Sequence, residues 1–486
     1  MAKIKKQKEY ENSKIIMSSY GMAQFFGQWI TGPFGLFVFF FYEAEIGLNV
    51  VLCGTAFIIF SLWNAINDPL IGYLLDHIKM PWEKRWGKRF PWILLASVPW
   101  LFSFLLIFLV PPNWYGTPQL VADNQWLIFA WFLITLCLYD TLYTLWNVNS
   151  NALYPDKFQD LDERRTATTI GTLIGMMGIV AGFIIPPMFV RNSFPETYRL
   201  AGWISVGLGI IFFLFMVPGV FEGPKLRARY QEYRVKAEKL EHEPFLKSVK
   251  RAVSDRRFMV KTIFFFGYQA GVALLQASAF YMVIFVLHED SGFLSILMAF
   301  MLLGAFASVP LWGYFAHRAN NNKKLSLYAG LVMFITFLPI FFVNGLLFYL
   351  IALFLFGIGL GGQWAMDPPT MGDVLDDLAV RTGKRQAALY YGYTLFFIRL
   401  SGTFQALVFI VVHILTNFPA GVQTYEGLVS VVGADNVFWP LLGIRIHAAL
   451  IPAILVLITI FIFWKWYDLT PDKVAANQEK LKELGL

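Results

Sequence analysis

Twelve long apolar segments dominate this chain of 486 residues and decide which solvent it folds in. They lie near residues 20–42, 49–77, 91–111, 126–153, 167–190 and 201–221, and near 258–287, 292–317, 324–344, 346–371, 387–415 and 438–465. A helix of about 20 apolar residues crosses the hydrocarbon core of a bilayer, where every backbone polar group must be bonded within the protein. The sequence therefore predicts an all-α membrane protein with twelve transmembrane helices.

Composition agrees with a chain that lies in lipid. Hydrophobic residues make up 57% of it and charged residues 15%, against roughly 25% in soluble domains. A net charge of +7 is compatible with nucleic-acid binding, but the excess of lysine and arginine lies in short loops, so we exclude that partner. Cys53 and Cys137 both fall in apolar segments without disulfide or metal-site spacing, and we predict no metal and no cofactor.

The loop charges predict an orientation. Lysine and arginine are concentrated in the N-terminal tail, in residues 78–90, 154–166, 222–257, 317–324 and 373–386, and in the C-terminal tail. Because positive residues stay on the cytoplasmic side, we expect both termini to be cytoplasmic, in a plasma membrane or a bacterial inner membrane. No cleavage pattern follows the lysine-rich start, so we expect the first apolar segment to be retained as a span.

A short pattern occurs twice, once in each half of the chain. Residues 69–73 are Pro-Leu-Ile-Gly-Tyr and residues 310–314 are Pro-Leu-Trp-Gly-Tyr, and a basic stretch follows each. A match at equivalent places indicates a duplicated six-helix unit, which is the plan of many secondary transporters. We therefore expect two six-helix bundles, residues 1–221 and 258–486, joined by a cytoplasmic linker with a short helix at 222–257.

Polar side chains form stripes inside the predicted spans, where they are costly and usually functional. Asn64, Asn67 and Asp68 are spaced i, i+3, i+4 and share one helix face, directly before Pro69, which frees a backbone carbonyl. The fourth predicted span carries a stripe of Asp140, Thr144, Asn147 and Asn151, with Tyr143 and Trp146 beside it. Other spans contribute Gln24, Gln28, Gln269, Gln276, Gln363, Trp364, Asp367 and Arg399.

Two interpretations of these groups remain open. Amide side chains can simply bond helices to one another, and an Asp–Arg bridge between the halves can be purely structural. The number of facing stripes instead favours a transport site in which Asp68, Asp140 and Arg399 form a gate or a coupling element. A guanidinium near a carboxylate would hold it ionised, whereas a dry bundle would push it towards protonation.

Three stretches carry a more specific signal. One joins Trp-Asn-Ala-Ile-Asn-Asp-Pro at 63–69 to Arg-Trp-Gly-Lys-Arg-Phe-Pro-Trp at 85–92, the second runs over 143–156 and 162–164, and the third over 371–377, 382–385 and 390–392. Together they resemble the glycoside–pentoside–hexuronide:cation symporter family of the major facilitator superfamily, which includes melibiose permease. The resemblance implies the major facilitator fold and transport by alternating access.

The chain departs from that family at several charged positions. Asn64 and Asn147 align with carboxylates of the family's cation site, and Gln28 aligns with a carboxylate that binds sugar hydroxyls. The arginine that pairs with the latter aligns near Ile170. Sodium is best held by several oxygens with enough negative charge. We therefore expect coupling to a proton, or no coupling, rather than to sodium.

The resemblance assigns the remaining roles as expectations. Asp68 or Asp140 would carry the proton, and Arg399, which matches the family's basic residue on the eleventh span, would act as a built-in cation in an uncoupled carrier. The coupling-ion candidates are Asn64, Asn67, Asp68, Asp140, Thr144, Asn147 and Arg399. The solute-binding candidates are Gln28, Asn64, Asp140, Tyr143, Asn147, Asn151, Trp364, Asp367 and Arg399.

A sugar, a glycoside or a related small solute is the expected cargo, and a lipid-like solute is the alternative. We expect a secondary active transporter that works as a monomer surrounded by membrane lipid. Charges near the helix ends are expected to gate the cytoplasmic side. These gating candidates are Asp76, Arg85, Lys88, Arg89, Asp156, Arg164, Asp373, Asp377 and Arg385.

A membrane-embedded prenyl-phosphate enzyme is the main rival class. Asp373, Asp376 and Asp377 resemble an Asp-x-x-Asp-Asp magnesium site, and Lys384 and Arg385 follow. Short motifs of this kind discriminate poorly, and no second acidic motif of the right kind occurs. A channel is disfavoured because no ring of like charges or filter-like repeat appears. We therefore predict a carrier and not an enzyme.

Overall fold

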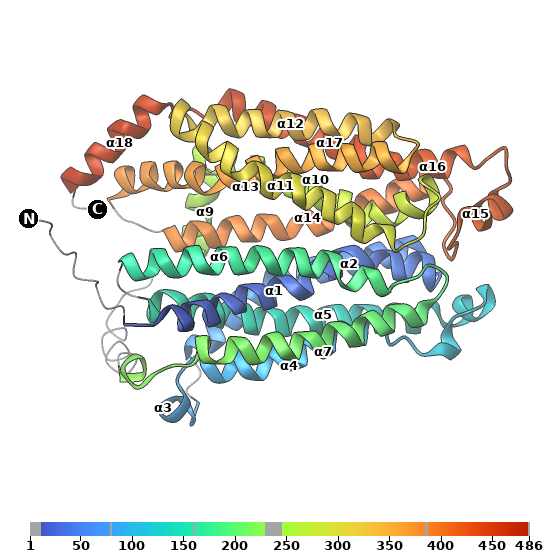
Figure 1. Cartoon of the computed structure of the whole chain (residues 1–486), viewed down its shortest axis with the longest axis horizontal. Coiled ribbons are helices and arrows are strands. Elements are labelled where there is room, and N and C mark those ends of the chain that lie inside the picture. Colours follow the sequence, from blue (N-terminus) through green and yellow to red (C-terminus); the bar gives the residue numbers. More distant parts are fainter. Residues whose placement is uncertain (1–10, 78–79, 159–160, 229–244, 384–386, 485–486) are drawn as a thin grey trace, which may run out of the picture.

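The computed structural model describes residues 11–77, 80–158, 161–228, 245–383 and 387–484, and within them the chain is helical. Twelve helices in these ranges are long and apolar enough to cross a membrane. The start of α1 and the end of α18 lie at one end of the bundle, which we call the termini end, and α15 lies at the other, which we call the α15 end (Figure 1). The predicted all-α, twelve-span fold is confirmed.

The first six spanning helices are separated by short connections. They and their adjoining turns are α1 (Lys14–Phe40) with the π-helical turn η1 (Phe41–Glu45), α2 (Val50–His77), α4 (Phe90–Ile107), α5 (Pro118–Lys157), α6 (Leu161–Ile184) and α7 (Pro195–Val220). Short elements lie between them: α3 (Glu83–Trp86), η2 (Pro112–Trp114) and η3 (Pro186–Phe189).

The last six spanning helices follow a short amphipathic helix, α9 (Phe245–Ser254). They are α10 (Arg256–Tyr281) with the π-helical turn η4 (Met282–Val286), α11 (Phe293–Ala319), α12 (Asn322–Phe342), α13 (Leu346–Thr382), α14 (Ala387–Leu415), and α16 (Phe438–Arg445) continued by η5 (Ile446–Leu450) and α17 (Ile451–Trp466). Two further helices are α15 (Tyr425–Val432) and α18 (Pro471–Leu484).

The two sets of helices pack within themselves and meet mainly along three pairs of helices. In the first set α1 packs on α6 and α7, and α5 packs on α2 and α4; in the second set α13 packs on α11 and α12, and α17 on α10 and α12. Across the molecule α1 meets α10, α2 meets α14 and α6 meets α11 (Figure 1). Each of these pairs joins helices from opposite halves. The faces that the paired helices turn to one another therefore form the central interface.

Three glycines permit a close helix crossing between α11 and α13. A Cβ atom on Gly357 would lie 2.1 Å from the carbonyl oxygen of Met301, and one on Gly361 would lie 2.2 Å from that of Ala305. A Cβ atom on Gly304 of the facing helix would lie 2.1 Å from the carbonyl oxygen of Phe354. Small residues four apart let helix backbones approach in lipid, where burial of apolar surface does not drive association. This crossing therefore depends on the missing side chains.

The two halves repeat one backbone detail at the α15 end. η1 extends α1 and η4 extends α10, and each widens the helix by one residue per turn. The N–H of Ile46 donates to the carbonyl of Phe41, and the N–H of Leu287 donates to that of Met282, each over 2.9 Å. This equivalence supports the internal duplication that the repeated Pro-Leu-x-Gly-Tyr pattern indicated.

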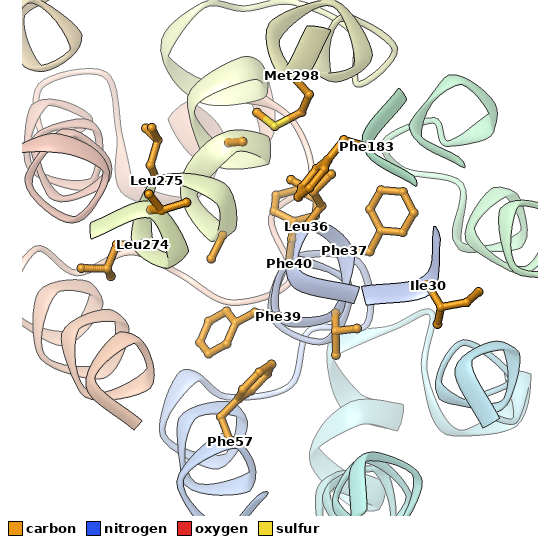
Figure 2. Close-up of a cluster of buried hydrophobic side chains, with 14 of the residues drawn as sticks. Ile30, Leu36, Phe37, Phe39, Phe40, Phe57, Phe183, Leu274, Leu275 and Met298 are labelled. Carbon is orange, nitrogen blue, oxygen red and sulfur yellow. The ribbon is translucent and has the colours of Figure 1, made fainter. Parts of the chain in front are cut away.

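Aromatic side chains of the two halves pack together where α1 and α10 approach the α15 end, and Figure 2 shows Phe37, Phe39 and Phe40 in this buried cluster. Phe40 stacks on Phe280 with ring centroids 4.9 Å apart, and Phe37 contacts the same ring at 5.7 Å. Phe39 packs on Phe409 at 4.7 Å. These rings are buried, so the space between the halves is closed at this end.

The predicted helix bounds were wrong at several polar ends. α13 continues through Pro368 and Pro369 to Thr382, so Asp373 and Asp377 lie on a helix and not in a loop. The helix persists because Val374 and Leu378 are buried, which compensates for the two missing N–H donors.

Other charged ends also proved helical. Asp156 lies on α5 and Arg164 on α6, and both positions were expected in a loop. Residues 416–437, expected to be irregular, contain α15. The linker helix was expected from the charged run at 234–241, which lies outside the described residues, and within the expected linker α9 covers Phe245–Ser254.

Candidate solute and coupling site

The polar stripes of α2 and α5 meet at Asp140, inside the bundle. The Nδ2 atom of Asn64 donates to Oδ1 of Asp140 over 2.6 Å, and Nδ2 of Asn67 donates to Oδ2 over 3.1 Å. Asp140 is 1% exposed, and these two amide donors occupy both of its oxygens. The Oδ1 atom of Asn64 is buried beside it without a hydrogen-bond partner. The i, i+3 spacing in α2 therefore presents two donors to one carboxyl group.

Asp68 joins the two halves of the protein. Its Oδ1 accepts a hydrogen bond from Thr144 on α5 over 2.5 Å, and its Oδ2 lies 3.1 Å from a guanidinium nitrogen of Arg399 on α14. The guanidinium also lies over the ring of Tyr143, 5.6 Å from its centroid. The side chains of Asp68 and Arg399 are 30% and 23% exposed, so the pair is partly hydrated. The expected proximity of this arginine and carboxylate is present.

A cavity of about 390 Å³ lies between the halves. Its polar lining comes from α1, α10, α13 and α14, and consists of Gln28, Thr31, Gln269, Gln276, Trp364 and Ser401. The remaining lining is apolar and includes Phe183 and Leu360. This lining is uncharged, with amide and hydroxyl groups beside one indole ring, and such a surface suits a neutral solute.

Not every solute-binding candidate faces this cavity. Gln28 and Trp364 line it, whereas Asn151 donates to Oδ1 of Asn147 over 2.8 Å along α5. Asp367 instead forms an ion pair with Lys261 of α10.

Lys261 is a site residue that the sequence did not single out. It lines a small pocket of about 70 Å³ together with Asp367, Thr394 and Ile398. A lysine at the fourth position of a predicted span resembles an interfacial residue that extends its amine to water. Its side chain is 3% exposed, and only the fold shows that the amine turns inward to a carboxylate.

The basic motif after α2 is held by a buried glutamate. The backbone N–H groups of Lys88, Arg89 and Phe90 donate to the carboxylate of Glu222 over 3.0, 2.6 and 2.8 Å. Gly87 has φ of 98°, and a Cβ atom there would lie 2.2 Å from an oxygen of Glu222. The glycine of Arg-Trp-Gly-Lys is therefore required both by backbone conformation and by space.

The gating candidates of the first half bond within that half. Arg89 lies 3.5 Å from the carboxylate of Asp156, and Arg164 donates to the carbonyl of Phe158 over 2.9 Å. Arg85 is exposed, with its guanidinium 5.7 Å from the ring centroid of Trp86. The side chain of Asp76 and the whole of Arg385 lie outside the described residues.

The gating candidates Asp373 and Asp377 of the second half also bond within their own half. Asp377 accepts hydrogen bonds from Arg257 over 2.5 Å and from Arg381 over 2.8 Å, and Asp373 accepts from Asn322 over 2.9 Å. Arg257 also binds Asp468 and holds the pKa of that carboxyl well below its usual range. The negative charge of Asp468 therefore persists at any physiological pH.

The geometry defines a class of protein. Twelve spanning helices in two packed sets, with a polar cavity and an Asp–Arg pair between them, form a secondary transporter of the major facilitator type. Residues 19–471 match the family described as MFS/sugar transport protein, and the chain belongs to this family. The family predicted from the three motifs is confirmed, and because its members are transporters, the prenyl-phosphate enzyme is ruled out.

Relatives of this chain are named as symporters. A sodium-dependent lysophosphatidylcholine symporter 1 from Gallus gallus is 24% identical over 87% of this chain and 80% of its own length. The sodium-dependent lysophosphatidylcholine symporter 1-A from Danio rerio is 23% identical over 82% of this chain and 78% of its own length. The uncharacterized symporter YnaJ of Bacillus subtilis is 25% identical over 78% of each chain.

A solved structure supports the fold independently. The D-xylose-proton symporter superposes with a TM-score of 0.58 over 93% of this chain and 96% of its own, at 13% sequence identity. That identity is low enough that the similarity extends to the fold and not to the solute.

Proposed function

We propose that this transporter carries a neutral, hydroxyl-rich solute, a sugar or a glycoside, through the cavity between its halves. The uncharged lining of that cavity carries the proposal. Gln28, Gln269 and Gln276 offer amide groups that can donate to and accept from hydroxyls, and Trp364 offers a face for a sugar ring. Residues 1–221 and 258–486 would move as two bodies about the linker 222–257, by alternating access.

A lipid-like solute is the second candidate. The names of the vertebrate relatives, which match over more than four fifths of the chain, favour it. The apolar part of the cavity lining, with Phe183 and Leu360, would suit an acyl chain. Against it, the described lining of the cavity holds no charged side chain for a zwitterionic head group.

Counterflow into proteoliposomes distinguishes the two candidates. We expect saturable exchange of labelled sugars or glycosides, and none of lysophosphatidylcholine. Trp364→Ala and Gln28→Ala should each weaken solute binding by about tenfold, the equivalent of one lost hydrogen bond or stacking contact. Gln24→Ala, one turn away on α1 and outside the cavity lining, is the matched control and should bind normally. Exchange of the lysolipid alone would replace the proposal with its alternative.

We also propose that a proton, rather than sodium, is coupled to transport, and that Asp140 carries it. Asp68 already has a cation in Arg399, whereas Asp140 is bonded by amides and is almost fully buried. A buried carboxyl with neutral partners is the more readily protonated of the two.

A gradient experiment tests this coupling. In proteoliposomes, accumulation should follow an imposed pH gradient, and Asp140→Asn should abolish that accumulation while counterflow persists. Accumulation that follows a sodium gradient and ignores pH, as the names of the vertebrate relatives suggest, would contradict it.

The membrane setting completes the proposal. The chain is an integral membrane protein, and we place it in a plasma or bacterial inner membrane with both termini cytoplasmic, because the basic loops lie at the termini end. The α15 end would then face outward. We further propose that one copy, surrounded by lipid, suffices for transport, because the cavity lies within a single chain.

A further inference from the structure

A second group of buried ionisable side chains crosses the interface, at the α15 end and away from the cavity. Glu43 belongs to η1 of the first half, whereas Tyr281, His413 and His447 belong to the second half. All four are at most 1% exposed. Neither the repeated pattern nor the polar stripes pointed to them, since Glu43 follows the end of a predicted apolar segment and the other three lie singly within theirs.

These side chains form one hydrogen-bonded chain. Oε1 of Glu43 lies 2.6 Å from Nδ1 of His413, and Oε2 accepts a hydrogen bond from the hydroxyl of Tyr281. Nε2 of His413 lies 3.2 Å from Nε2 of His447, whose Nδ1 lies 2.6 Å from the hydroxyl of Ser278. The carboxylate of the first half is thus bound by two side chains of the second.

The positions of the protons follow from the partners at the end of this chain. The hydroxyl of Ser278 donates to the carbonyl of Leu274 over 2.6 Å, so its oxygen accepts from the Nδ1–H of His447. Neutral His447 then presents a bare Nε2, which accepts from the Nε2–H of His413. One further proton remains, between Nδ1 of His413 and Oε1 of Glu43. With that proton the network is neutral overall, and without it a buried negative charge is left.

The other ionisable groups nearby belong to the first half. Cys53 lies behind Glu43 and donates to the carbonyl of Leu48. Glu45 accepts hydrogen bonds from the N–H of Ser193 and the hydroxyl of Tyr198, so it is held within its own half. None of these described groups supplies a positive charge to Glu43, and the shared proton is therefore what neutralises it.

The backbone at this point suits a moving contact. η1 carries Glu43, η5 carries His447, and η4 follows Tyr281 directly. π-helical turns are rare in proteins overall, and those that occur often lie at functional sites. The same turns form the seal, where the N–H of Gly421 donates to the carbonyl of Glu43 and Gln423 donates to that of Glu45.

We propose that Glu43 and His413 form a proton-dependent latch that closes the α15 end by binding one proton between the two halves. When the end opens, the two side chains separate into water and the proton leaves, since an imidazole in water loses its proton at a pH of about 6.5. The latch is distinct from the coupling proposed at Asp140. It rests on the proposed function only in that the two halves move apart.

The sign of the pH dependence follows from the proton count. Above a pH of about 6.5 the closed state holds one proton more than the open state, so rising pH favours opening. The ratio of closed to open protein should fall up to about tenfold for each pH unit, until the closed network itself loses its proton. Below that pH both states hold the proton, and the ratio should be flat.

Distances between spin labels measure this ratio without any solute. We would label Asp123→Cys in α5 and Ser430→Cys in α15, both exposed at the α15 end, in full-length protein with Cys53→Ala and Cys137→Ala, in lipid nanodiscs. The long-distance population should rise between pH 7 and pH 9, up to about 100-fold relative to the short one. Absence of any pH response in this range overturns the latch.

Amide variants test the residues themselves. In Glu43→Gln the amide can donate to neutral His413 and accept from Tyr281, so the end still closes but the response above pH 7 should vanish. The double variant Glu43→Gln/His413→Gln is used where the single variant folds poorly. Its two amides can bond one another, so the end should again close without a response above pH 7. Glu45→Gln, on the same turn, is the control and should keep the response. A response unchanged in both amide variants also overturns the latch.

The outcomes separate the two proposals. Protein whose distances respond to pH but which exchanges no sugar contradicts the proposed solute and leaves the latch intact. Protein that exchanges sugar but whose distances do not respond to pH contradicts the latch and leaves the proposed solute intact.

Discussion

Arg399→Ala should reduce counterflow by roughly 30–150-fold, the largest effect on exchange of any single substitution at the central site. Removing one partner of a fully buried ion pair costs about 3–5 kcal/mol, because the other charge is left without compensation. About a quarter of each side chain is exposed here, so we expect about 2–3 kcal/mol, which corresponds to that factor in rate or equilibrium. Tyr143 would also lose the cation that lies over its ring.

A double-mutant cycle gives this prediction its control. Asp68→Asn removes the opposite charge, and Asp68→Asn combined with Arg399→Ala should be less damaging to thermal stability than either single change. Arg399→Lys keeps the charge but loses the planar group over Tyr143, and an intermediate rate is expected. The measurements are counterflow and the melting temperature of purified protein. Strictly additive losses would mean that the ion pair does not act as a unit.

Gly357→Ala is expected to destabilise the fold more than any other conservative change on α13. The new methyl group would lie 2.1 Å from the carbonyl oxygen of Met301, and a backbone atom cannot rotate away as a side chain can. Overpacking of this kind costs about 1–3 kcal/mol, and Gly357→Ala/Gly361→Ala should cost more than either alone. We expect a clearly lower melting temperature in detergent.

Gly372→Ala on the same helix is the matched control. A Cβ atom there meets no other atom within 4 Å, so the substitution should be neutral or slightly stabilising through its helix propensity. A melting temperature of Gly357→Ala equal to that of Gly372→Ala would show that α11 and α13 can separate without loss. The proposed role of the glycines in this crossing would then be wrong.

Much of the fold was predictable because a bilayer imposes a strong constraint. Each of the twelve segments had to be helical to bond its own backbone, and the observed spans agree with the predicted ones to within a few residues at most ends. The exceptions are informative. α5 begins at Pro118, where the side chain of Thr117 caps the helix, and α13 reaches Thr382, where Val374 and Leu378 are buried.

The candidate site was predictable in part, and for a similar reason. Asn64, Asn67 and Asp140 were singled out because polar groups in a span are costly, and spacing alone placed Asn64 and Asn67 on one face. Their hydrogen bonds to Asp140 depend on how α2 packs against α5. Lys261 and Glu43 were missed because a single charged residue near the end of a span also fits an interfacial position.

The amino-acid sequence by itself determined the solvent, the number of spans and the family, since these follow from composition, periodicity and short motifs that local physics constrains. Tertiary structure alone decided which polar groups meet. Asp68 and Arg399 are 331 positions apart in the chain, and Glu43 and His413 are 370 apart. Contacts over such separations depend on how helices cross and rotate, which apolar periodicity leaves open. The central ion pair and the proposed latch therefore emerge only when the two halves are packed together.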